Sequence, residues 1–239
     1  MSAVGLDVFF AEMAELLAGR RTAAQCEAVL GPSPSGTSRF GVYATLVDRQ
    51  QRAALDSLYR AALVAAVAWD RSKAEELRAG FLRTAPPGHW SPTVVAAPFA
   101  DYLEAQGAPT DVVELADFSR TRHDVLRAPA SDGISGLAVR HYTHAVRDFT
   151  IAVERGERAT GRPEATPSTW LFGRHRETAS LVLVVPSLAV LVALQIIDDR
   201  AWSPELPAVE QTEVASAVTF LYDQGLLSKV AVDTVRVHL

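Results

Sequence analysis

The sequence has a single cysteine, Cys26, in a chain of 239 residues. One cysteine cannot form an internal disulfide, so the sequence carries no sign of an oxidising compartment. No histidine or basic residue stands beside Cys26 to depress its thiol pKa, which favours a core position over a nucleophilic role. The N-terminus also lacks the basic start, the long apolar stretch and the cleavage site of a signal peptide. We therefore predict a cytoplasmic protein.

The sequence has no excess of positive charge. Its formal charge is −5, and both parts are mildly acidic when the chain is divided near Ala130. An acidic chain has no general attraction to nucleic acid or to anionic lipid. Apolar residues make up 49 % of the chain and charged residues 21 %, which is typical of a globular protein with a core.

Only one apolar run approaches the length of a membrane span, at residues 179–197. Pro186 and Ser187 interrupt its middle. This pair favours a buried strand that is followed by a newly capped helix. A membrane anchor is the alternative interpretation.

No motif of an enzyme class occurs. The nucleophile-elbow, zinc-deaminase and dinucleotide-binding patterns are all missing. Among six histidines only His141 and His144 are close together, and in a strand their spacing of three places them on opposite faces, which is unsuited to one metal ion. We predict no catalytic residue, no metal and no cofactor. An active site assembled from distant residues is the alternative, and it would require turnover by the purified chain alone.

Helical periodicity dominates the first half of the chain. Breakers rich in glycine and proline separate the helical segments, and proline cannot continue a helix. The predicted helices are an N-terminal one and those near residues 22–30, 40–68, 72–86, 98–107 and 110–128. These segments predict an all-α domain that spans about 1–128.

The pattern changes after the polar, turn-rich stretch 128–136. Strands alternate with helices beyond it, and Gly225 follows one helix as a C-terminal glycine commonly does. We predict strands at 137–145, 168–175, 179–185 and 227–233, and helices at 146–156, 187–199 and 210–223. The expected fold class is therefore α+β, with a helical domain at 1–128 and a winged-helix-like domain at 134–239.

A winged-helix unit is also a common DNA-binding fold, so DNA binding is the alternative to consider. The helix that would enter the major groove, at residues 212–223, has no lysine or arginine and carries Glu213 and Asp223. Recognition in that groove needs donors toward base edges and cations toward phosphates. The sequence argues against DNA reading by this helix.

An exposed sheet edge beside a helix suits a different ligand, an extended peptide that adds a strand to the sheet. We expect the groove to lie between the strand 180–185, or its neighbour 169–173, and the helix 213–223. The candidate peptide-binding residues are Ser180, Val182, Val184, Ser216, Thr219, Phe220 and Asp223.

Several motifs of the first half resemble the N-terminal domain of the HvfC/BufC-like family, which is catalogued by name as a DNA-binding domain. The shared pattern is an arginine and a tyrosine four apart, a Leu-Tyr bend, a Phe-Leu step before two prolines, a Phe-x-x-Tyr-Leu helix and a closing Leu-Ala-x-Phe. It falls on Arg39, Tyr43, Leu58, Tyr59, Phe81, Leu82, Pro86, Pro87, Phe99, Tyr102, Leu103, Leu115, Ala116 and Phe118. Arg60 and Ser119 depart from it, where the family commonly has proline and glutamate.

Residues 169–199 and 214–230 resemble the PqqD-type peptide-recognition fold, also called the RiPP recognition element, in their strand pair and in a last helix that ends in Leu-x-x-x-Gly-Leu-Leu. Together the resemblances imply a non-catalytic partner of multinuclear non-heme iron oxidative enzymes. Such enzymes modify cysteines in ribosomally made peptides and are often linked to copper handling. The partners implied are a precursor peptide and the iron-dependent enzyme, in a hetero-oligomer, with neither nucleic acid nor membrane. The competing class is a DNA-binding transcriptional regulator.

Overall fold

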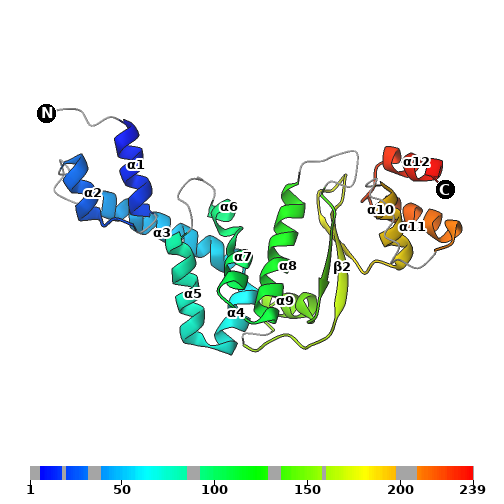
Figure 1. The fold of residues 1–239 in the computed structure, drawn as a ribbon, viewed down its shortest axis with the longest axis horizontal. Coiled ribbons are helices and arrows are strands. Elements are labelled where there is room, and N and C mark those ends of the chain that lie inside the picture. Colours follow the sequence, from blue (N-terminus) through cyan, green and yellow to red (C-terminus); the bar gives the residue numbers. More distant parts are fainter. Residues whose placement is uncertain are drawn as a thin grey trace. The chain divides into compact units, whose positions relative to one another are not determined.

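The computed structural model describes residues 6–17, 20–31, 39–84, 92–128, 136–157, 160–197 and 209–238. Helices predominate, and the strands form one small antiparallel sheet (Figure 1). The predicted α+β class with a helical N-terminal region is confirmed.

Chain contacts define two compact units, Met1–Asp117 with Val146–Pro163, and Phe118–Ala145 with Glu164–Leu239. These units differ from the predicted domains 1–128 and 134–239, which stay a prediction, and most of the predicted linker lies outside the described residues.

The first unit is helical, as the periodicity predicts. Its elements are α1 (Leu6–Leu17), α2 (Ala23–Leu30), α3 (Arg39–Leu58), α4 (Arg60–Trp69), α5 (Arg71–Thr84), α6 (Pro92–Ala96), α7 (Phe99–Ala105), the start of α8 (Thr110–Arg127) and α9 (Val146–Glu154). The short α6 was not predicted. The helix α9 packs against α4 through an apolar face that includes Val146, Phe149 and Val153.

The predicted single helix over 40–68 is wrong, because Tyr59 divides it into α3 and α4. The backbone of Tyr59 has φ −112° and ψ 26°, outside the helical region. Its side chain is fully buried, its hydroxyl donates to the carbonyl oxygen of Ala97 at 2.8 Å, and its ring centroid lies 5.1 Å from that of Phe99. The N–H of Tyr59 still donates to the carbonyl oxygen of Leu55, and its own carbonyl oxygen accepts the N–H of Leu63, so the two helices adjoin at Tyr59 with these hydrogen bonds kept.

Cys26 lies in the core of the first unit, as predicted. The side chain of Thr22 caps α2 by accepting the N–H of Gln25, so the helix begins just before the cysteine. The thiol is fully buried and donates to the carbonyl oxygen of Glu12. Burial raises the pKa of the Cys26 thiol, which disfavours the reactive thiolate.

The second unit contains the sheet. Its elements are the rest of α8, β1 (Ala138–Tyr142), β2 (Ser168–Arg174), β3 (Leu181–Val184), α10 (Leu188–Ile197), α11 (Gln211–Asp223) and α12 (Lys229–His238). The apolar run 179–197 is thus divided into a strand and a helix, as predicted. No helix among the described residues is both long and apolar enough to cross a membrane.

The predicted strand over 227–233 is wrong, because this segment begins the helix α12. The alternation of Val230 and Val232 with polar residues resembles a strand pattern. However, the hydroxyl of Ser228 accepts the N–H of Ala231 at 3.1 Å, which is the geometry of a helix N-cap. Within α12, Ala231 and Val232 are buried in the core cluster whereas Val230 is exposed, so the helix buries one side. A winged helix in this unit stays a prediction.

The two faces of β2 pack against different helices. Leu171 belongs to a core cluster with side chains of α10, α11 and α12, and Val182 and Val184 of β3 pack against the same cluster. On the opposite face, the ring of Phe172 lies 5.2 Å from that of Phe118 on α8. Helices therefore cover both faces and leave only the edges of the sheet for pairing.

Candidate peptide-binding site

The sheet has the strand order β1–β2–β3, with both pairings antiparallel. β2 lies in the centre and is paired on both sides. Residues 171–174 of β2 pair with β3 and offer no free edge there. Thr169 and Trp170 pair only with β1, so the alternative groove along 169–173 stays a prediction. Within the described part of the chain β3 pairs only with β2, so its second edge is open.

The pairing of β2 with β3 fixes which backbone groups reach this open edge. The N–H of His175 donates to the carbonyl oxygen of Ser180 at 2.8 Å, across the turn that joins the two strands. Hydrogen-bonded pairs recur at every second residue of an antiparallel ladder, so Val182 and Val184 are the next to bond inward to β2. The N–H and C=O groups of Leu181 and Leu183 consequently point outward.

The predicted residues of this strand therefore differ in position. Ser180 is exposed in the turn before β3, with its hydroxyl 2.7 Å from that of Thr178. The side chains of Val182 and Val184 are half-buried against the core cluster. The outward backbone groups of Leu181 and Leu183 were missed, because the two-residue period of a strand assigns them only once the hydrogen bond at the His175 turn is known.

The four predicted residues of α11 are all exposed. The hydroxyl of Ser216 donates to the carbonyl oxygen of Thr212 at 2.8 Å, and that of Thr219 donates to Ala215 at 3.0 Å. Phe220 exposes 40 % of its surface, a large fraction for a phenylalanine. Asp223 lies at the end of the helix.

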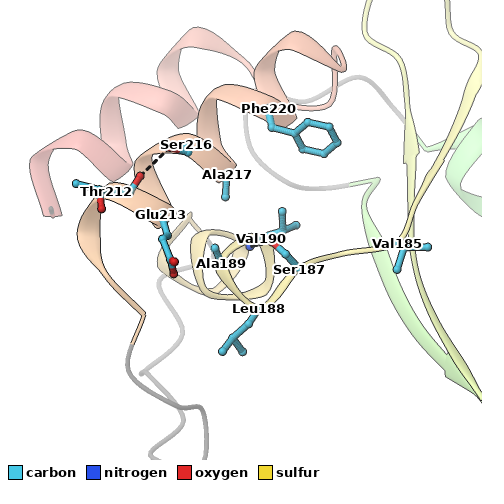
Figure 2. Close-up of a pocket in the computed structure, with 10 residues that line it drawn as sticks. All are labelled: Val185, Ser187, Leu188, Ala189, Val190, Thr212, Glu213, Ser216, Ala217 and Phe220. Carbon is cyan, nitrogen blue, oxygen red and sulfur yellow. Dashed lines mark hydrogen bonds between the residues drawn. The ribbon is translucent and has the colours of Figure 1, made fainter.

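A cleft of about 680 Å³ lies between the start of α10 and the side of α11 (Figure 2). Ser216 and Phe220 line it, whereas Thr219, Asp223 and the β3 residues do not. In Figure 2 the ring of Phe220 projects from α11 toward the side on which Val185 lies. Val185 directly follows β3 and exposes 66 % of its surface. The cleft therefore adjoins the end of the open strand.

Sequence reasoning missed the α10 side of this cleft. The missed lining residues are Ser187, Leu188, Ala189 and Val190, whereas Val185 belongs to the predicted strand of the groove. The hydroxyl of Ser187 accepts the N–H of Val190 at 3.3 Å, so the predicted Pro-Ser start of this helix is also where one wall of the cleft begins. The packing of α10 against α11 is a tertiary contact, and no local pattern reports it.

The cleft is mainly apolar and carries one charged side chain, Glu213. α11 as a whole contains Glu213 and Asp223 and no basic residue. A phosphate backbone along this helix would meet two carboxylates and no cation. The apolar lining suits an extended peptide with apolar side chains. Such a peptide needs main-chain hydrogen bonds from the strand and an apolar surface that every second side chain contacts.

His175 connects the turn after β2 to the turn after α11. Its Nδ1 lies 3.2 Å from the backbone nitrogens of Glu177 and Thr178 and accepts from both. The ring packs under Gly225, where φ is +66° and a Cβ atom would lie 2.6 Å from Nε2 of the histidine. The N–H of Arg176 donates to the carbonyl oxygen of Gly225 at 2.9 Å. These contacts hold the β2–β3 turn against the end of the helix that lines the cleft.

The paired histidines His141 and His144 have separate neighbours. Nδ1 of His141 lies 2.9 Å from the hydroxyl of Thr169, and Nδ1 of His144 lies 3.0 Å from that of Thr143. Within the described residues no group of three or more histidine, cysteine, aspartate and glutamate side chains is placed to hold a metal ion.

Comparison with known proteins finds no family model that matches the chain and no curated protein that is significantly similar to it. The resemblances to the HvfC/BufC-like family and to the PqqD-type fold therefore stay predictions.

Proposed function

We propose that this protein is a non-catalytic adaptor, which binds a ribosomally made precursor peptide along β3 and presents it to a multinuclear non-heme iron enzyme for cysteine modification. The observation that carries the proposal is the open, wholly aliphatic edge of β3 beside the apolar cleft. The iron and the oxidative chemistry belong to the partner enzyme in this proposal. The adaptor contributes binding and orientation.

The composition of β3 supports strand addition. Natural proteins protect exposed edge strands with charged side chains, proline or bulges, because an unprotected edge pairs with other chains. Apart from its short length of four residues, β3 (Leu181–Val184) has none of these devices. An edge of this kind would promote aggregation unless a partner strand occupies it.

The position of the cleft supports side-chain selection. A guest strand that pairs with Leu181 and Leu183 would place every second side chain on the face that bears Val182, Val184 and the helices. Beyond the strand, Val185 and Phe220 offer apolar surface to the next guest residue on that face. Main-chain bonds thus supply affinity, and the cleft supplies preference for an apolar residue.

The test titrates synthetic cysteine-bearing candidate precursor peptides into the full chain by isothermal calorimetry. Leu183→Pro removes an outward N–H and leaves the bonds to β2 in place, so we expect peptide affinity to fall at least about tenfold. Leu183→Ala is the matched control, since it shortens the same side chain but keeps the N–H. Equal affinities of the proline variant and the alanine variant would contradict pairing at this edge.

The adaptor role has a second test. The full chain should co-purify with a co-expressed multinuclear non-heme iron enzyme, and modification of the peptide should require both proteins. Turnover by this chain alone would refute the assignment of the chemistry to the partner.

A further inference from the structure

The helices α3 to α5 form one of the basic regions of an acidic chain. Residues 39–84 contain eight lysines and arginines and five aspartates and glutamates, a formal charge of +3. The remaining residues contain fifteen basic and twenty-three acidic side chains, a charge of −8. This separation of charge within one chain gives the α3–α5 region a different class of preferred partner from that of α11.

A groove of about 570 Å³ lies between α4 and α5 within this basic region. Leu63, Val64 and Val67 of α4 and Ala74 of α5 supply its apolar lining. Val67 exposes 40 % of its surface although it lies on the same helix as several fully buried alanines. The lining therefore leaves aliphatic surface in contact with solvent.

The charged residues of the groove are not balanced. Arg78 is paired with Asp56, which neutralises both. Arg60, at the first turn of α4, and Arg71, at the first turn of α5, are exposed and have no ion pair among the described residues. Glu75 is the one acidic residue of the lining besides Asp56. Two arginines thus border the aliphatic surface and are available to carboxylates of a partner.

We infer that this groove docks an acidic amphipathic helix of a partner protein. Aliphatic side chains of that helix would contact Leu63 and Val67, and its glutamate or aspartate side chains would meet Arg60 and Arg71. Recognition by an apolar stripe with flanking charges is the usual way in which a helix is bound in a groove, and opposite charges would also accelerate its association.

This surface is separate in sequence from β3 and α11. Under the proposed function the docked helix would belong to the iron enzyme, and that assignment rests on the proposed function. The binding of an acidic helix does not rest on it, because the groove and its arginines are independent of the peptide site. If the acidic helix does not bind, the proposed peptide site on β3 is not contradicted, and the reverse also holds.

The test measures fluorescence anisotropy of a labelled synthetic helix of about 18 residues, a length at which isolated helices form. The helix is built from leucine, glutamate and alanine, with leucines at spacings of three and four. We expect saturable binding to the full chain, which weakens as salt is raised. Replacing every glutamate of the probe by lysine should abolish binding.

Charge reversal locates the binding. The double variant Arg60→Glu and Arg71→Glu should weaken binding about tenfold, because two attractions become repulsions. Arg83→Glu makes the same type of change on α5 outside the groove and should alter affinity less than about twofold. The inference is overturned if the acidic helix fails to saturate, if the lysine helix binds equally, or if Arg83→Glu weakens binding as much as the double variant. It is also overturned if the wild-type chain self-associates in sedimentation velocity and the double variant does not, since the occupant is then a second copy.

Discussion

The two edges of the sheet differ in the side chains that border them. β1 carries Arg140 and His141, both exposed, and so has the charged protection that edge strands usually need. β3 consists of Leu181–Val184, carries no charge and has a second edge that no described residue covers by pairing. One edge strand of the sheet thus carries an exposed cation, and the other consists only of aliphatic residues. Under the proposed function, the bare edge of β3 is kept for a partner strand.

The largest effect should come from proline substitutions at adjacent positions of β3. Val182→Pro removes a hydrogen bond to β2 and should lower the free energy of unfolding by about 3 kcal/mol or more. Leu183→Pro removes only an outward N–H and should have a clearly smaller effect. Urea denaturation followed by circular dichroism measures both. Equal losses would mean that the inward and outward positions are assigned wrongly.

The next effect tests the comparison of the two edges directly. Leu183→Lys gives β3 the kind of protection that β1 already has, and it should weaken binding of the precursor peptide about tenfold. Val139→Lys places the same charge on β1 and should leave peptide affinity unchanged. Calorimetric titration compares the two variants, and thermal unfolding verifies that both are folded. A loss at Val139 equal to that at Leu183 would remove the distinction between the edges.

A smaller effect is expected in the cleft next to β3. Phe220→Ala should lower peptide affinity up to about tenfold, because an aromatic anchor in a cleft contributes strongly to binding. Its effect on stability should stay below about 1 kcal/mol, since the side chain is 40 % exposed. Tyr222→Ala is the matched control on the same helix, because Tyr222 is 47 % exposed and does not line the cleft. If both variants reduce affinity equally, the cleft has no part in selection.

The smallest effect should be that of salt. Pairing along an uncharged edge depends on main-chain hydrogen bonds, so peptide affinity should change less than about twofold between about 50 and 200 mM salt. Duplex DNA, titrated in parallel, tests the competing hypothesis of a DNA-binding regulator. Binding through phosphates would weaken steeply over that range of salt. A steep decline for the peptide would indicate that charges, rather than the bare strand, dominate its recognition.

Much of the fold could be predicted from the sequence because local patterns agree with tertiary packing. The aliphatic run around Leu181–Val184 and the Pro-Ser pair after it indicated a strand and then a helix, and both are observed. Prediction failed where a tertiary contact overrides the local pattern. Tyr59 interrupts a helical pattern in order to reach Phe99, and Ser228 caps a helix in a segment whose valines alternate as in a strand.

The candidate site could be predicted only in part. Exposed positions on α11, such as Ser216 and Phe220, follow from helical periodicity once the buried face is known. The opposite wall of the cleft depends on how α10 packs against α11, and residues such as Leu188 and Ala189 carry no local sign of it. The outward direction of Leu181 and Leu183 depends on a single hydrogen bond at the His175 turn, which sequence alone does not fix.

The alternation of inward and outward amides along β3 has a consequence for the guest chain. In a strand bound to Leu181 and Leu183, successive side chains point to opposite faces of the sheet. Only the odd-numbered or only the even-numbered residues of the guest therefore face the helices. Inserting one residue between the segment that pairs with β3 and its apolar anchor exchanges these sets, whereas inserting two restores them. The spacing of a precursor peptide should therefore tolerate changes by even numbers better than by odd ones.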